Sequence, residues 1–115
     1  MSLKRIVNKI IDKYGREVIR KPRIETIENG EITYTYGDTE LIRGWISQIT
    51  GYKELWEAAG ILVEADLVAQ FPADTTIEIG DLVKVDNEWY EVVEKIKRSL
   101  GNKIHSIECL LRKRE

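Results

Sequence analysis

Few side chains in this chain of 115 residues could do chemistry. It has one cysteine, Cys109, and one histidine, His105, four positions earlier. In a strand, this spacing places both side chains on one face but far apart along it, which is unfavourable for a nucleophile–base pair. No second pair exists to complete a zinc site, and one cysteine cannot form an internal disulfide. A buried structural thiol is the simpler interpretation of Cys109.

Four aspartates, Asp66, Asp74, Asp81 and Asp86, are the other candidates, either for acid–base chemistry or for a divalent cation site. Their spacing matches neither an EF-hand loop nor a catalytic carboxylate pair. Asp81 and Asp86 fit better as turn residues that flank a strand. The sequence also lacks the phosphate-binding loop, the dinucleotide fingerprint, the nucleophile elbow and the zinc-protease motif. We therefore expect no enzyme activity, no catalytic residue, no metal and no cofactor.

Charge is distributed unevenly, although the net charge is only −2. Residues 1–23 hold eight basic and two acidic side chains. Residues 24–93 hold three basic and fifteen acidic side chains, and residues 94–115 hold seven basic and three acidic ones. This pattern can indicate nucleic-acid contact, or basic ends of one copy that dock on the acidic middle of the next. Alternatively, folding brings ends and middle together and the charges mix. The candidate subunit-docking charges are Lys4, Arg5, Lys9, Arg112, Lys113 and Arg114.

The composition, with 43% apolar and 33% charged residues, predicts one compact domain over residues 1–115. The longest apolar or glycine stretch, residues 58–63, is much shorter than the roughly 20 residues that span a bilayer. No signal peptide is visible at the N-terminus. We expect no membrane association.

Hydrophobic periodicity predicts a helix followed by strands. Apolar residues at helical spacing indicate an amphipathic helix over residues 3–14, ended by a left-handed Gly15. Asn29-Gly30 between two β-rich segments, 24–28 and 32–36, indicates a tight hairpin. Further strands are expected over 39–49, 61–71 (broken by Pro72), 81–85, 89–98 and 104–111, with Ile107, Cys109 and Leu111 on one face.

Short antiparallel strands at this spacing predict a mainly β protein. The expected fold is a small antiparallel β-barrel, SH3-like or OB-like in size, with an N-terminal helix and an irregular inserted loop or short helix. The expected layout is a helix over 1–15, a hairpin and strand over 24–49, a variable insertion over 44–60 with a short helix at 53–59, and barrel strands over 61–113.

The aromatic residues suggest contact positions. Trp45, Tyr52, Lys53 and Trp56 lie in or beside the insertion and are candidates for a partner-binding or channel-facing loop. Tyr34 and Tyr36 share one face of the hairpin and could stack on bases, but their acidic surroundings favour packing or protein contact. Trp89 and Tyr90 are adjacent in a strand, so one of them should face the core.

The second half of the chain carries a recurring theme: a Gly-Asp-hydrophobic strand, a turn, a Tyr-x-Val strand, and a closing strand with a basic tail. Its segments are Gly60–Asp66, Phe71–Asp74, Gly80–Val83, Glu88–Val93 and Ile107–Leu111. This theme resembles the head–tail joining proteins of tailed viruses (phages), also called head completion, stopper or head-closure proteins. Residues 1–59 match that family only in layout.

The resemblance implies a virion structural protein of the neck between head and tail, assembled in the host cytoplasm. Copies would form a six-fold or twelve-fold ring, templated by the portal and its adaptor, which closes the DNA channel after packaging and docks the tail. Contact with genomic DNA would be non-specific, and an acidic lining would reduce adhesion. The stretch 44–60, or the hairpin turn Asn29-Gly30, is expected to project into the channel or onto the adjoining ring.

Two alternatives stay open. A tail-completion or tail-terminator protein shares the virion context but has different neighbours. A cellular small β-barrel module that binds single-stranded nucleic acid would show a similar strand and turn pattern, and its affinity should fall steeply with salt.

Overall fold

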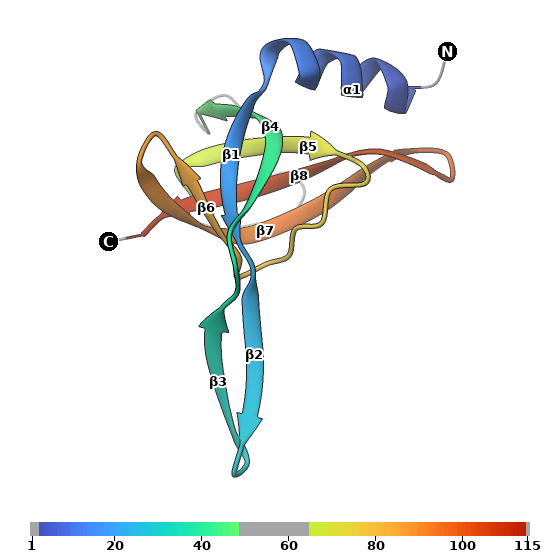
Figure 1. Cartoon of the computed structure of the whole chain (residues 1–115). Helices are drawn as coiled ribbons and strands as arrows, with labels where there is room; N and C mark the ends of the chain where they lie inside the picture. The colour runs from blue at the N-terminus through green and yellow to red at the C-terminus, as the bar shows by residue number, and fades with distance from the viewer. Residues whose placement is uncertain (1–2, 49–64, 115) are drawn as a thin grey trace.

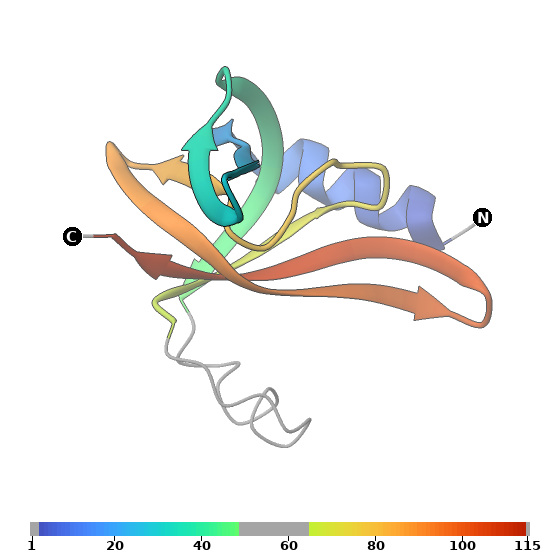
Figure 2. The same cartoon turned by 90° about the horizontal axis from the view of Figure 1, so that it is seen from below.

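The computed structural model describes residues 3–48 and 65–114, and these form a six-stranded closed barrel with one helix and one projecting hairpin (Figures 1 and 2). The barrel order is β1-β4-β5-β8-β7-β6, closed by pairing of β6 with β1, and every pair is antiparallel. The elements are α1 (Leu3–Tyr14), β1 (Arg16–Lys21), β2 (Arg23–Glu28), β3 (Glu31–Tyr36), β4 (Glu40–Gln48), β5 (Leu67–Pro72), β6 (Leu82–Val85), β7 (Glu88–Leu100) and β8 (Lys103–Lys113). The predicted fold, a small antiparallel barrel with an N-terminal helix, is confirmed.

The core fills the inside of the barrel with alternate residues of its strands. On β5 and β8, Ala69 lies opposite Cys109 and Phe71 lies opposite Ile107. All four side chains point into the barrel core. This confirms the shared face predicted for β8. Tyr90 is in the core, whereas Trp89 points outward with the amines of Lys21 and Lys84 at 5.0 and 5.8 Å from its ring.

Helix α1 has the predicted bounds and packs against β4, β5 and β8. Ile11 is fully buried, but Leu3 and Ile6 remain 37% and 39% exposed, so the apolar stripe is only partly covered. Gly15 does follow the helix, and its amide donates to the Ile11 carbonyl at 2.8 Å. Its predicted left-handed conformation is wrong. Glycine is needed here for space, because a Cβ would lie 2.4 Å from the Ile11 carbonyl oxygen and 2.9 Å from that of Gly44.

Three predicted boundaries need correction. Strand β1 was not expected, because half of its six residues are Arg or Lys. The strand expected from residue 61 begins, within the described residues, at Leu67, since Asp66 forms a bend whose carboxylate accepts the Lys113 amide at 2.6 Å. Pro72 ends that strand and still pairs with Ser106. Residues 44–48 belong to β4, not to an insertion. The rest of the expected insertion, including the short helix expected at 53–59, lies outside the described residues.

Two hairpins extend beyond the barrel. We call residues 23–36 the arm: β2 and β3 pair only with each other and project away from the barrel below it in Figure 1. Its turn is the predicted one, with positive φ at Asn29 (52°) and Gly30 (81°). We call residues 97–105 the tip hairpin: it is the end of the long β7–β8 pair, at the right of both views.

Candidate interaction surface

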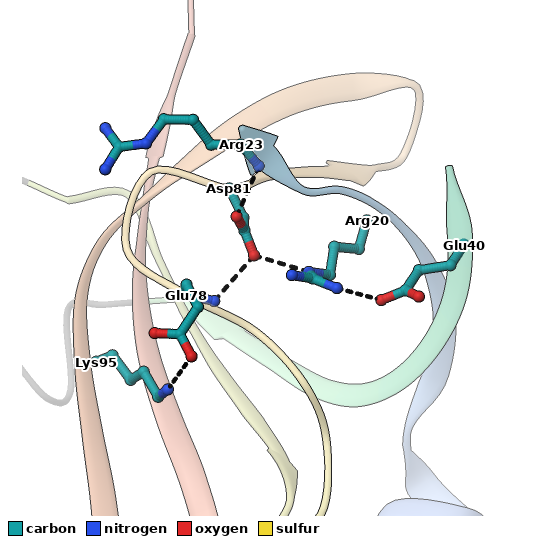
Figure 3. Close-up of polar contacts among 6 residues, drawn as sticks. All are labelled: Arg20, Arg23, Glu40, Glu78, Asp81 and Lys95. Atoms are coloured by element: carbon teal, nitrogen blue, oxygen red, sulfur yellow. Dashed lines mark hydrogen bonds and ion pairs between the residues drawn. The ribbon is translucent and has the colours of Figure 1, made fainter. Parts of the chain in front are cut away.

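The arm is held at its root by a buried carboxylate (Figure 3). Asp81, only 1% exposed, accepts three hydrogen bonds: from the Arg20 Nε at 2.7 Å, the Arg23 amide at 2.9 Å and the Glu78 amide at 2.9 Å. These donors belong to the end of β1, the start of β2 and the loop before β6. One side chain therefore fixes the place where the arm leaves the barrel.

Arg20 completes this cluster from the barrel side. It is 6% exposed, and its guanidinium also pairs with Glu40 at the start of β4. Burial alone would lower the pKa of Arg20, but the hydrogen bonds to Glu40 and Asp81 outweigh it and the pKa is raised. Arg20 is therefore charged, and its pairing with Glu40 links β1 and β4, the two strands that continue into the arm.

The guanidinium of Arg23 approaches the backbone closely at Gly80, beside the arm root. This residue has φ +97°, and a Cβ on it would lie 2.2 Å from the guanidinium carbon of Arg23. The same guanidinium stacks on the Tyr34 ring at 4.4 Å. Nearby, Arg114 donates to the Tyr36 hydroxyl at 2.6 Å. Both arm tyrosines are thus partly used for packing against arginines, as the sequence favoured.

The free half of the arm presents apolar side chains. Residues directly opposite in the pairing share a face, so Ile27 and Ile32 lie together on the face that also carries Tyr34. Their exposed fractions are 70%, 54% and 51%. An apolar and aromatic face on a projecting hairpin is typical of a contact surface.

The predicted partner-loop residues divide between described and undescribed parts of the chain. Trp45 lies on β4, is 41% exposed and lines a surface pocket with Ser47, Val68, Gln70 and Glu108. Tyr52, Lys53 and Trp56 lie outside the described residues, so the structure does not place them relative to Trp45.

The predicted docking charges lie on two separate elements. Lys4, Arg5 and Lys9 are exposed on α1. At the other end, Arg112 pairs with Glu91 and the Lys113 Nζ with Glu88, both at 3.1 Å, while Arg114 contacts the arm. The hydrogen bond with Glu88 raises the pKa of Lys113. The C-terminal charges therefore already contact their own chain.

Charge from the two ends mixes in part with the acidic middle. Arg16 pairs with Asp86 at 2.9 Å and Lys95 with Glu78 at 3.1 Å, in addition to the pairs of Arg20, Arg112 and Lys113. Folding thus partly neutralises the uneven distribution of charge along the sequence. Opposite charges persist on the two projecting hairpins, which the sequence alone does not distinguish from the rest of the chain.

Two remaining polar candidates, Cys109 and His105, both lie on β8. Cys109 is fully buried in the barrel core, as expected of a structural thiol. The Nδ1 of His105 lies 3.1 Å from the Ser106 hydroxyl. Among residues 3–48 and 65–114, no three His, Cys, Asp or Glu side chains are grouped so as to hold a metal ion. The helix of this same part is too short and too polar to cross a membrane.

Because Cys109 is buried, the stability of the fold should depend on pH. Desolvation raises the pKa of its thiol from 9.0 to about 12. The unfolded chain therefore loses this proton at lower pH than the folded chain, so stability should fall as the pH rises from 9 toward 12. Urea unfolding across this window checks the sign. Cys109→Ala should flatten part of the slope, and an unchanged slope would contradict the assignment.

Comparison with known proteins adds no relative. No protein-family model matches the chain, and no curated protein matches its sequence.

Proposed function

We propose that this chain is a structural subunit of the neck of a tailed virus, in a ring that adjoins the portal and its adaptor, closes the DNA channel and docks the tail. The observation that carries the proposal is the arm: a hairpin with exposed Ile27, Ile32 and Tyr34, fixed rigidly at its root by Asp81. A rigid projection with an uncovered apolar face serves assembly between subunits. The resemblance of residues 60–111 to head–tail joining proteins supplies the viral context.

The closed barrel supports the same proposal. Because all six of its strands are paired around the ring, the barrel itself has no free edge for strand addition. Within the described part of the chain, contacts are then left to the hairpins, the helix and the barrel surface. A connector subunit needs such separate surfaces for the neighbour in its ring, for the portal side and for the tail side. The arm, the tip hairpin and α1 lie on different sides of the barrel (Figure 1).

Localisation in particles tests the proposal. With a gold label on the C-terminus, electron micrographs of complete particles should show label at the head–tail junction. In preparations where heads and tails are produced separately, label on the heads supports a connector. Label on free tails would instead support a tail-completion or tail-terminator protein, and unlabelled particles would contradict a virion role.

A binding assay tests the cellular alternative. A single-strand-binding module should bind an oligonucleotide with an affinity that falls steeply with salt. The proposal predicts only weak, non-specific binding, since Arg23 and Arg114 are already engaged with Tyr34 and Tyr36. Tight, salt-sensitive binding lost on Tyr34→Ala would favour the alternative.

A further inference from the structure

The end of the arm carries acidic charge that its own fold leaves without a counterion. Glu28 and Glu31 lie directly opposite each other beside the turn, and like charges in this position destabilise a hairpin. Within the described part of the chain, no cation pairs with either of them, or with Glu25 on the same arm. The exposed pair Ile27 and Ile32 lies beside them along the two strands but on the opposite face of the arm.

The tip hairpin carries the opposite charge. No acidic residue occurs between positions 95 and 107. Lys97 and Lys103 are exposed on this hairpin and pair with no acid among the described residues. Leu100, opposite Lys103, is 69% exposed, and Ile104, opposite Ser99 on the other face, is 39% exposed.

The two hairpins cannot meet within one molecule in this fold. In Figure 1 the arm points away below the barrel while the tip hairpin extends to the right, and Figure 2 shows the same separation from below. Each hairpin is anchored, the arm by the Asp81 cluster and the tip hairpin by continuous pairing with the barrel. A contact between them therefore requires two copies.

We infer that the arm of one copy docks on the tip hairpin of a second copy. Glu28 and Glu31 of the arm meet Lys97 and Lys103 of the tip hairpin. The acids, which repel each other in the free subunit, then gain counterions, so electrostatics selects this partner. The contact joins two different surfaces, so it is heterologous and closes into a ring or continues as a filament. This contact deepens the proposed function. Only the statement that the ring lies beneath the portal rests on that function.

Zero-length carbodiimide cross-linking tests the contact, because it joins carboxylates to amines that touch. The full chain is prepared in ordinary and heavy-nitrogen forms, mixed equally at high concentration, cross-linked and digested. Peptide pairs of mixed isotope come from two copies. Pairs that join Glu28 or Glu31 to Lys97 or Lys103 are expected. The inference is overturned if such pairs are absent, or if the arm joins Lys4 or Lys9 of α1 instead.

Charge exchange provides the matched control. Glu28→Lys with Glu31→Lys, and separately Lys97→Glu with Lys103→Glu, should each reduce dimer yield about tenfold, as expected if roughly 1.4 kcal/mol of attraction is lost. Mixing the two variants should restore a linked heterodimer, since opposite charges meet again. Failure of the mixture to associate would contradict the contact, even if both variants fold normally.

The outcomes separate this inference from the proposed function. If mixed-isotope links form but labelled protein is absent from the necks of particles, the contact stands and the viral role fails. If the protein lies at the neck but the arm never links to a tip hairpin, the role stands and this contact is wrong.

Discussion

Replacing Asp81 with alanine is expected to lower the free energy of unfolding by about 3–5 kcal/mol, because removing one partner of a buried ion pair leaves the other charge uncompensated. Arg20 would remain 6% exposed with only the half-exposed Glu40 as counterion. The amides of Arg23 and Glu78 would also lose their acceptor. A loss of this size corresponds to a fall in Tm of about 10 °C or more.

Urea denaturation measures this loss, and the chain offers a matched control. Asp74 is an exposed aspartate in the loop before β6, so Asp74→Ala should change stability by no more than about 0.5 kcal/mol. Asp81→Asn keeps a carbonyl acceptor but removes the charge, and it should fall between the two. Equal stability of Asp81→Ala and Asp74→Ala would show that the cluster does not hold the arm root.

The second large effect concerns binding and leaves the fold intact. Ile27→Ser combined with Ile32→Ser should reduce the affinity of the protein for heads made without it by about a hundredfold or more, if each isoleucine contributes the roughly 2 kcal/mol typical of an interface anchor. Their exposed fractions of 70% and 54% mean that stability should hardly change. Sedimentation of labelled protein with such heads measures the affinity.

A single exposed residue elsewhere serves as its control. Leu41 on β4 is 67% exposed, similar to Ile27, but lies on the barrel wall and not on the arm. Leu41→Ser should bind heads like the unchanged protein. If this variant loses affinity as strongly as the arm variant, the effect comes from general surface apolarity and the arm has no special role.

Local sequence patterns account for most of the fold. The helical spacing of residues 3–14, the Asn29-Gly30 turn and the inward parity of Ile107, Cys109 and Leu111 each depend on neighbours a few positions apart, so they could be predicted. The bend at Asp66 could not, because its cause is the amide of Lys113, far along the chain.

The site was harder to predict for the same reason. From its basic surroundings in the sequence, Arg20 is expected to be one more cation on the surface. Only the fold shows that it is buried against Asp81, which lies 61 positions later. Asp81 was expected as a turn residue, and its amide does form a turn with the Glu78 carbonyl, but its main contribution is the ion pair. The available signal for the burial of Arg20 was its spacing of two residues from Val18, which places both side chains on one side of a short strand.

The charge pattern shows a similar limit. Sequence counts placed residues 94–115 with the basic N-terminus as docking ends, yet Arg112 and Lys113 pair with acids of their own chain. Lys97 and Lys103, on the tip hairpin, pair with no acid among the described residues. Closure of the barrel decides which cations pair with acids. A short segment of the sequence does not contain that information.

The proposed role in closing the head can be tested by measuring the DNA retained in particles made without this protein. We expect heads that package their genome and then lose it, with retention restored when the purified protein is added back and not restored by the Ile27→Ser, Ile32→Ser variant. Heads that keep their DNA and join tails normally in its absence would contradict the claim.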